Sequence, residues 1–286
     1  MDHEEKNKVE GGTLYLVSTP IGNLADLSPR GIKILSEVDF IAAEDTRVAA
    51  KLLLALDMPT KPMIPYHDHN RREKGFSILQ RLRSGQSGAL ISDAGTPAIS
   101  DPGQDLVREC IDCGIPVTSV PGCCAAVTAL ILSGLDTRRF AFEGFLEGRV
   151  SDRVAALTRI AADPRTQIFY EAPHRLVDTL QLMKQVLGGD RSIALCRELT
   201  KRNEEILRTD IDSALAYYER TEPRGEYVLV LQGFVETAES VFWSDMSVQE
   251  HVTYYEEKMS LSRMDAVKAV AKDRGVAKNV IYKQML

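Results

Sequence analysis

Short apolar segments alternate with amphipathic segments along the first 135 residues of the chain. Residues 13–18, 39–44, 88–92 and 116–120 are brief runs rich in side chains that favour strands. Apolar residues recur at helical spacing between and after these runs, as Leu53 and Leu56 do after the second run, and the predicted helices with defined bounds are residues 30–37, 71–83, 104–113 and 125–133. Strands that alternate with helices form a parallel or mostly parallel sheet covered on both faces. We therefore predict an N-terminal α/β domain over residues 1–120.

The second half of the chain has a different pattern. Strand-like runs lie at residues 140–145, 166–171, 191–198, 204–209 and 227–234. Only two clear helical segments, near residues 152–162 and 176–187, lie among them. The last three strands follow one another with shorter connections, which is typical of an antiparallel or mixed sheet. This pattern predicts a second α/β domain over residues 121–238.

The C-terminal residues have a helical pattern. Residues 235–245 (VETAESVFWSD) have the composition of a linker. Beyond them, Val248, Val252 and Tyr255 follow the 3.6-residue period, and further apolar positions lie on both sides of Gly275. Helices around a glycine turn predict a small helix-turn-helix-like extension over residues 246–286.

The composition is that of a folded protein without a membrane span. Of the 286 residues, 44% are hydrophobic and 27% are charged, which excludes a wholly disordered chain. The best apolar run, residues 125–132, is far shorter than the roughly 18 residues that a spanning helix needs. The charged first residues lack the apolar stretch of a secretory signal. We expect a cytoplasmic protein.

The five cysteines fit a reducing compartment. Cys110 and Cys113 form a C-x-x-C pair, but neither a second pair nor a pair of spaced histidines follows, as a structural zinc site requires. We therefore predict no metal site.

The charge is unevenly distributed. The chain has a formal charge of −6, whereas residues 263–286 contain six Lys or Arg against two Asp, a net charge of +4. The remaining residues therefore carry −10, which argues against a protein that coats nucleic acid non-specifically. A basic end on an acidic body indicates a phosphate-bearing partner that is met at that end.

Turns rich in glycine and proline follow the predicted strands of the first domain, at residues 18–23, 93–97, 101–103 and 121–122. In open α/β sheets, ligands bind outside the carboxyl ends of the strands. Each turn alone is ordinary, but four turns at one edge indicate a ligand site. Neither G-x-G-x-x-G nor G-x-x-x-x-G-K-[ST] is present, which disfavours a dinucleotide-dependent oxidoreductase.

The carboxylates and histidines near these turns allow two interpretations. Asp45 and Asp101 stand where a side chain caps a helix, or where a side chain faces a ligand. His67 and His69 resemble a metal motif, but no other histidine lies near them in the sequence. His174 is either buried and paired or faces the cleft. Spacing alone defines no Ser-His-Asp or Cys-His arrangement.

Several motifs in a fixed order carry a resemblance to a known family. They are residues 13–26 (TLYLVSTPIGNLAD), 43–47 (AEDTR), 90–103 (LISDAGTPAISDPG), 121–126, 142–146 (FEGFL), 169–175 (FYEAPHR) and 197–201 (RELTK). Together they resemble the tetrapyrrole methylase superfamily and, within it, the branch that methylates small-subunit ribosomal RNA. The resemblance covers about residues 12–235, and residues 266–282 are similar to a helical extension found in many members. The family has Pro-Gly-Pro where this chain has Pro121-Gly122-Cys123, a difference confined to one loop.

The resemblance implies a two-domain α/β fold, that of the class III methyltransferases. It implies a homodimer that holds S-adenosylmethionine in the cleft between the domains of each chain. It further implies methyl transfer to the ribose 2′-hydroxyl of a cytidine in the decoding region of 16S ribosomal RNA, either free or in the small ribosomal subunit.

The resemblance also implies the site residues. The expected cofactor-binding residues are Pro20, Asp93, Ala94, Gly95, Thr96, Ile99, Asp101, Cys124, Ala125, Phe145, Leu146 and Tyr170. The expected proton acceptor is Glu44 or Asp45, with His67 as the next choice. The expected RNA contacts are Asn23, Arg47, Lys268, Lys272, Arg274 and Lys278.

Two other functions are compatible with this fold. A tetrapyrrole C-methyltransferase would use the same cofactor on a different acceptor, but such an acceptor does not require a Lys-rich tail. A non-catalytic RNA-binding assembly factor is disfavoured by the intact loop at residues 93–103.

Overall fold

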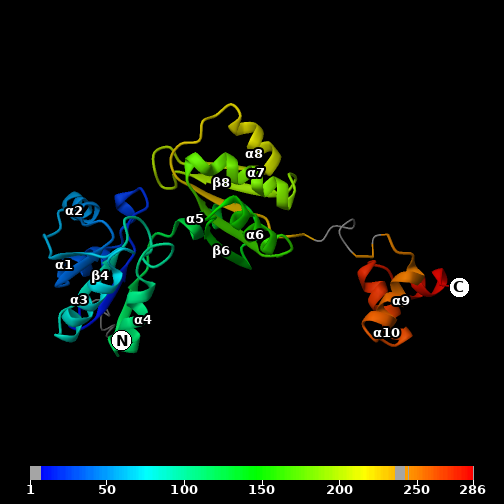
Figure 1. Ribbon diagram of the computed structural model, residues 1–286, viewed down its shortest axis with the longest axis horizontal. Helices are drawn as coiled ribbons and strands as arrows, with labels where there is room; N and C mark the ends of the chain where they lie inside the picture. Colours follow the sequence, from blue (N-terminus) through cyan, green and yellow to red (C-terminus); the bar gives the residue numbers. More distant parts are fainter. Residues whose placement is uncertain (1–7, 236–241, 244, 286) are drawn as a thin grey trace, which may run out of the picture. The chain divides into compact units, whose positions relative to one another are not determined.

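The computed structural model describes residues 8–235, 242–243 and 245–285. The chain divides into two compact units, Met1–Gly233 and Phe234–Leu286 (Figure 1). The larger unit contains two five-stranded sheets, and the smaller unit is helical. The predicted boundaries at residues 120 and 238 remain predictions, since both sheets lie within one unit.

The first sheet is parallel throughout, as its sequence pattern predicts. Its strands lie in the order β3-β2-β4-β1-β5. They are β1 (Leu14–Val17), β2 (Phe40–Ala43), β3 (Met63–Pro65), β4 (Gly88–Ile91) and β5 (Val117–Val120). Because all five strands run in one direction, their carboxyl ends lie at a single edge, and the loops that leave them meet there.

Helices cover both faces of the first sheet. On one face, α1 (Pro29–Glu37) and α2 (Thr46–Ala55) pack apolar side chains against β1, β2 and β4. On the other face, α3 (Arg71–Arg83) and α4 (Gln104–Asp112) pack against Leu14, Phe40 and Leu90. Apolar residues on both faces of the strands explain why these strands are continuous hydrophobic runs. A short 3-10 helix, η1 (Leu24–Asp26), follows β1.

The second sheet is mixed, again as predicted. Its order is β6-β7-β10-β8-β9, with β6 and β7 parallel and the other neighbours antiparallel. The strands are β6 (Phe140–Phe145), β7 (Thr166–Glu171), β8 (Ser192–Arg197), β9 (Glu205–Asp210) and β10 (Tyr227–Leu231). In this arrangement the carboxyl ends of β6, β7 and β8 lie beside the start of β10.

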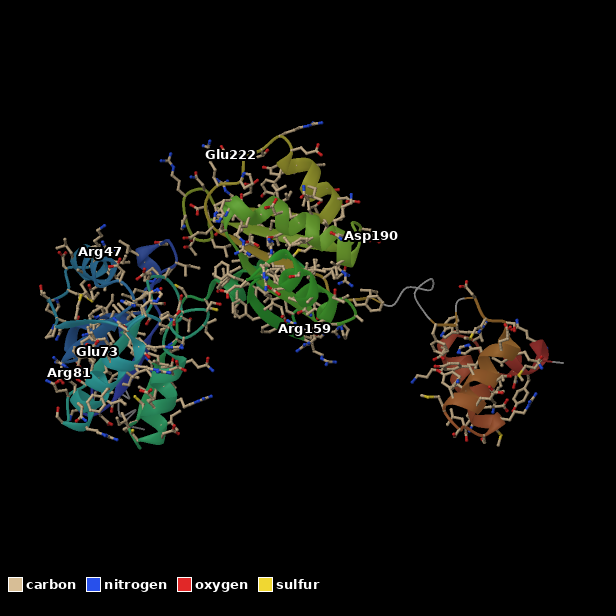
Figure 2. The ribbon with its side chains drawn as sticks, in the orientation of Figure 1. Arg47, Glu73, Arg81, Arg159, Asp190 and Glu222 are labelled. Atoms are coloured by element: carbon tan, nitrogen blue, oxygen red, sulfur yellow. The ribbon has the colours of Figure 1, made fainter. Side chains whose placement is uncertain are left out.

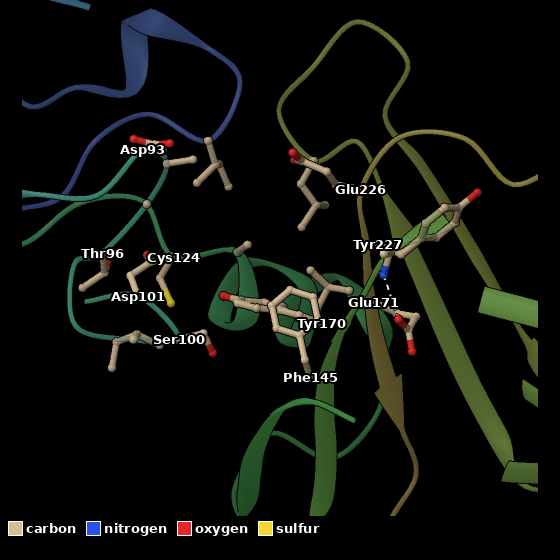
Figure 3. Close-up of a pocket in the computed structure, with 18 of the residues that line it drawn as sticks. Asp93, Thr96, Ser100, Asp101, Cys124, Phe145, Tyr170, Glu171, Glu226 and Tyr227 are labelled. Atoms are coloured by element: carbon tan, nitrogen blue, oxygen red, sulfur yellow. Dashed lines mark hydrogen bonds between the residues drawn. The ribbon is translucent and has the colours of Figure 1, made fainter. Parts of the chain in front are cut away.

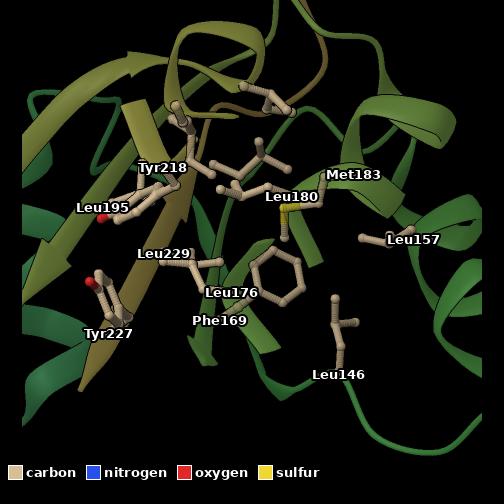
Figure 4. Close-up of a cluster of buried hydrophobic side chains, with 14 of the residues drawn as sticks. Leu146, Leu157, Phe169, Leu176, Leu180, Met183, Leu195, Tyr218, Tyr227 and Leu229 are labelled. Atoms are coloured by element: carbon tan, nitrogen blue, oxygen red, sulfur yellow. The ribbon is translucent and has the colours of Figure 1, made fainter. Parts of the chain in front are cut away.

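The larger core of this sheet lies against three helices (Figure 4). They are α6 (Val150–Ile160), α7 (Leu176–Leu187) and α8 (Ile211–Tyr218). Phe169, Leu195 and Leu229 from the strands are buried among side chains of these helices. On the opposite face, α5 (Ala125–Ser133) packs against Ile168, Val228 and neighbouring residues.

Two elements are absent from the sequence-based prediction. β3 is three residues long and only its central residue, Ile64, is buried, so its apolar signal is weak. The connection between β9 and β10, for which no helix was predicted, contains α8 (Ile211–Tyr218). Asp210 caps this helix by accepting a hydrogen bond from the backbone N–H of Ser213. The buried residues Ile211, Ala214 and Tyr218 repeat at helical spacing, so the signal was present in the sequence.

The C-terminal unit has three helices among its described residues, where the sequence pattern indicated helices on both sides of Gly275. They are α9 (Val248–Lys258), α10 (Arg263–Asp273) and α11 (Lys278–Gln284), and Gly275 lies between the last two. Val252, Val267, Val270 and Ile281 form their common core. Most of the predicted linker, residues 236–241 and 244, lies outside the described residues.

No helix in the described part of the chain is long and apolar enough to cross a membrane. Taken together, the two sheets and their helices form a mixed α/β fold with a small C-terminal helical unit, as the sequence predicts.

Candidate active site

A pocket of about 430 Å³ lies where the loops of the two sheets meet (Figure 3). From the first sheet it is lined by the loop after β4, by Glu44 after β2 and by Ile21 after β1. From the second sheet it is lined by the ends of β6, β7 and β8 and by the start of β10. The pocket therefore lies at the edge that the parallel strand order predicts, and its volume is in the range of small-molecule sites.

Hydrogen bonds fix the loop after β4 in place. Gly95 forms an isolated bridge with Thr19, with N–H to O distances of 2.9 and 3.1 Å in the two directions. Thr96 Oγ1 donates to the carbonyl of Cys123 at 2.8 Å. These bonds join the loops after β1, β4 and β5, so the first-sheet wall of the pocket is preorganised.

The same loop has an unusual backbone. Ala98 and Ser100 have φ angles of 66° and 59°, in the left-handed region that residues other than glycine rarely adopt. Each such residue costs of the order of 1–3 kcal/mol and is characteristic of functional loops. Ser100 lines the pocket, so the strained segment is part of the site.

Two carboxyl groups of the pocket have raised pKa values. Burial raises the pKa of Asp101 to about 6. Burial also raises the pKa of Glu44, and the negative charges of Asp101 and Asp93 raise it further. Both groups line the pocket. A carboxylate whose pKa is raised is a stronger base than an ordinary one, so both groups are candidates for a general base.

Asp45 is a helix cap, one of the two alternatives that its position allowed. It is the N-cap of α2, and its carboxylate accepts hydrogen bonds from the backbone N–H and the guanidinium of Arg47 at 2.8 and 2.6 Å. The bonds from Arg47 lower the pKa of Asp45 to about 2. Asp45 is not among the residues that line the pocket.

The predicted histidines lie outside the pocket. His67 Nε2 is 3.1 Å from the amide nitrogen of Asn70, just before α3. His174 is exposed in the 3-10 helix η2 (Pro173–Arg175) and neither faces the pocket nor is buried, which contradicts both sequence interpretations. Asp101 does not cap α4, because Gly103 occupies that position.

Aromatic rings form the second-sheet wall. The ring of Tyr170 packs edge-to-face against Phe145 and Phe142, with centroid distances of 5.6 and 4.9 Å. Burial raises the pKa of Tyr170 to about 12, so its hydroxyl is neutral at physiological pH. Phe145 is 42% exposed and presents an apolar surface to the pocket.

The structure brings together ten of the twelve residues predicted to bind a cofactor. These ten line the pocket: Asp93, Ala94, Gly95, Thr96, Ile99, Asp101, Cys124, Ala125, Phe145 and Tyr170. The other two do not. Pro20 lies next to the lining residue Ile21, and Leu146 is buried in the core of the second sheet.

Other lining residues were missed by sequence reasoning. They are Ile21, Ser100, Glu171, Ala172, Pro173, Cys196, Leu199, Glu226, Tyr227 and Val228. Ile21 lies inside the turn at residues 18–23, Ser100 lies between the turns at residues 93–97 and 101–103, and residues 171–173 directly follow Tyr170. The sequence does not indicate that residues 226–228 belong to a site, because only the pairing of β10 with β7 brings them to the pocket.

The residues predicted to contact RNA differ from one another in exposure and in their side-chain partners. Arg47 has an 85% exposed side chain on the surface of the larger unit (Figure 2), and Asn23 caps η1. In the C-terminal unit, Lys272 and Lys278 are exposed, and Lys268 pairs with Asp265 at 2.9 Å. Arg274 is held inside that unit. Its guanidinium donates to the carbonyl of Met246 at 2.6 Å and lies over the Trp243 ring.

Two sheets whose loops line one ligand-sized pocket define a two-lobed α/β fold with its candidate site between the lobes. The chain belongs to the family described as Tetrapyrrole (Corrin/Porphyrin) Methylases, whose match covers residues 13–215.

The chain is also similar to curated relatives. It is 47% identical over 273 residues to "Ribosomal RNA small subunit methyltransferase I" of Halalkalibacterium halodurans, covering 95% of this chain and 93% of that protein. It is 44% identical over 275 residues to the protein of the same name from Synechocystis, covering 96% and 98%. This chain is therefore a methyltransferase.

A solved structure with the same fold is that of uroporphyrin-III C-methyl transferase from Thermus thermophilus, in complex with S-adenyl homocysteine. The TM-score is 0.54 at 20% identity, over 77% of this chain and 97% of that chain. At this identity the likeness concerns the fold alone.

Proposed function

We propose that this chain uses S-adenosylmethionine to methylate the ribose 2′-hydroxyl of a cytidine in 16S ribosomal RNA. The observation that supports this acceptor is the similarity to the ribosomal RNA methyltransferases named above, which extends over 95% of the chain. Solved structures with the same fold match 77–79% of the chain. The similarity to the ribosomal RNA methyltransferases therefore extends over more of the chain than the shared fold does.

The pocket suits S-adenosylmethionine in size and charge. Asp93, Asp101 and Glu44 place carboxylates around a donor that carries a net positive charge, and opposite charges attract strongly in a partly buried site. The backbone of the loop can approach closely at Gly95, where an added Cβ would lie 3.2 Å from Ile21 Cγ2. Tyr170 and Phe145 supply the apolar surface that an adenine ring or a methylene chain requires.

When bound, S-adenosylmethionine supplies an activated methyl group for in-line displacement by an oxygen. The residues of this chain contribute alignment. The fixed loop after β4 and the aromatic wall hold the two reactants in line, and good alignment can lower a barrier by roughly 7–11 kcal/mol. Glu44 accepts the proton of the ribose hydroxyl, because its raised pKa makes it a stronger base than an ordinary carboxylate.

RNA binding is assigned to exposed cations outside the pocket. Arg47 contacts phosphate near the pocket, and Lys272 and Lys278 contact phosphate from the C-terminal unit. Phosphate contacts give affinity with little sequence choice, so the target nucleotide is selected by the shape of the ribosomal RNA. With ribosomal RNA as the acceptor, we also propose that the protein acts in the cytoplasm.

The test is methyl transfer to small ribosomal subunits and to free 16S RNA with labelled donor. We expect the label on one cytidine, at the ribose oxygen, so that the adjacent phosphodiester resists alkaline hydrolysis. Glu44→Gln is expected to bind the donor more weakly but still measurably, and to lose most turnover even at saturating donor. Label on a base atom, or no label on either substrate, would overturn the proposal.

We also propose that two copies of the chain associate through α5. This helix is apolar on nearly all sides, yet Val127 and Ile131 are 48% and 68% exposed, and a helix that is apolar all round is normally covered. Sedimentation is expected to give a dimer that Ile131→Asp dissociates. A monomer at micromolar concentration would contradict this.

A further inference from the structure

A chain of buried polar side chains runs behind the aromatic wall of the pocket. Glu171 is the last residue of β7, and its side chain is 1% exposed. One carboxylate oxygen, Oε2, accepts a hydrogen bond from Thr179 of α7, and the hydroxyl of Thr179 in turn accepts one from Arg153 of α6. Thr179 is fully buried and Arg153 is 7% exposed. The chain therefore joins β7 to two helices that lie away from the pocket.

The other carboxylate oxygen of Glu171 connects to the end of β6. Oε1 accepts a hydrogen bond from the N–H of Ala172 at 2.9 Å and lies 3.6 Å from Nε of Arg175. The guanidinium of Arg175 also donates to the carbonyl of Leu146, the residue that directly follows Phe145. Figure 3 shows Glu171 on the side of the pocket opposite the loop that carries Asp93 and Asp101.

This network holds the segments that form one wall of the pocket. Phe145 ends β6, and Tyr170, Ala172 and Pro173 flank Glu171. Thr179, Arg153 and Arg175 do not line the pocket, so they act on it only through Glu171 and Leu146. Leu146 itself is anchored in the apolar core, next to Leu157 and Leu176.

Stability alone is a poor explanation of the network. Buried charges lose hydration, and replacing a buried ionic cluster by apolar side chains of similar volume is often neutral or stabilising. What the network supplies is a fixed geometry at the ends of two strands. Residues that contact a reacting ligand must be held by locked neighbours to within fractions of an ångström.

We propose that Glu171 is a positioning residue for methyl transfer, and that the relay Arg153–Thr179–Glu171–Arg175 sets the position of Tyr170 and Phe145 against the donor. The proposal rests on the function proposed above. It assigns Arg153, Thr179 and Arg175, none of which lines the pocket, no contact with the donor or the RNA. Loss of the relay therefore displaces the wall and weakens donor binding without removing a group that reacts.

Thr179 offers a matched pair of variants for the test. Thr179→Val keeps the shape of the side chain but removes the hydroxyl that joins Arg153 to Glu171, whereas Thr179→Ser keeps the hydroxyl. Binding of S-adenosylhomocysteine is measured by calorimetry, and the KM for the donor and kcat are measured with small ribosomal subunits. We expect Thr179→Val to raise Kd and KM at least fivefold, and Thr179→Ser to stay within twofold of the unchanged chain.

A second pair separates positioning from a general loss of stability. Glu171→Gln is expected to raise Kd at least fivefold. Glu205→Gln removes another carboxylate of the same sheet that has two side-chain partners, Arg197 and Tyr217, and does not line the pocket. We expect it to leave Kd within twofold. A structural role would reduce kcat in proportion to the folded fraction and leave the KM for the donor unchanged.

The outcomes distinguish this inference from the function on which it rests. If Thr179→Val and Glu171→Gln are folded by circular dichroism and bind S-adenosylhomocysteine like the unchanged chain, the positioning role is refuted and the proposed function stands. The positioning role is also refuted if Thr179→Ser weakens binding as much as Thr179→Val. If the unchanged chain itself does not bind S-adenosylhomocysteine, the proposed function fails.

Discussion

Replacing Asp101 with Asn tests the electrostatics of the pocket. Asn has the same shape and retains an acceptor oxygen for Ser92, but it carries no charge. The pKa of Asp101 is about 6 in the folded chain against an ordinary value of 3.8. Its ionised form is therefore unfavourable in the folded state. We expect Asp101→Asn to stabilise the protein and at the same time to weaken donor binding.

The sign and size of the effect follow from the pKa. Below pH 3.8 the carboxyl is protonated in the folded and unfolded chains and costs no stability. As the pH rises through about 6, the unfolded chain has already lost this proton, and the folded chain is progressively destabilised. A difference of about 2 pH units corresponds to about 3 kcal/mol. Because Asp101 is partly exposed, we expect a gain of only about 1–2 kcal/mol from Asn above pH 7.

The assay is urea unfolding followed by far-ultraviolet circular dichroism between pH 4 and pH 8. Fluorescence of the single tryptophan is unsuitable, because Trp243 belongs to the C-terminal unit. Asp93→Asn is the matched control, since Asp93 lies in the same loop but is exposed, and we expect no comparable gain. The reasoning is refuted if Asp101→Asn is no more stable than the unchanged chain at pH 8, or if its gain does not depend on pH.

Three further changes have defined outcomes. Gly95→Ala is expected to raise the Kd for S-adenosylhomocysteine by at least tenfold in calorimetry, because residue 95 has a φ of 86° and the added Cβ would lie 3.2 Å from Ile21. An unchanged Kd would show that the backbone there is free to adjust. Leu229→Ala, in the centre of the second core (Figure 4), is expected to lower the free energy of unfolding by about 2–5 kcal/mol, and a loss below 1 kcal/mol would mean that this core is not tightly packed. Deletion of residues 246–286 is expected to weaken binding of 16S RNA in filter assays while leaving the affinity for S-adenosylhomocysteine unchanged. Loss of donor binding would instead make the tail part of the core structure.

The sequence predicts most of the sheet elements because their apolar pattern is strong. Strands of the first sheet are apolar on both faces, so they form continuous runs that turns interrupt clearly. The misses have weaker local signals. β3 buries one residue, and α8 is an eight-residue helix between two strands, so only its cap and three spaced apolar residues distinguish it from a loop. Pairing order cannot be derived from such local patterns. The position of β10 between β7 and β8 depends on packing across the whole sheet.

One part of the candidate site can be predicted from local sequence motifs, and the other part depends on contacts between residues that are far apart in the chain. Glycine-rich turns after parallel strands predict the first-sheet wall, because the residues of a turn themselves determine its backbone conformation. The second wall is assembled differently. Glu226 and Tyr227 reach the pocket because Tyr227 pairs with Glu171, 56 positions earlier in the chain. The relay behind that wall joins residues 153 and 171 through a threonine whose hydroxyl is satisfied only in the folded core. A lone threonine in an amphipathic helix carries no sequence signal for such a role. The first-sheet wall of the pocket is therefore predictable from motifs, whereas much of the second wall and the relay behind it become visible only in three dimensions.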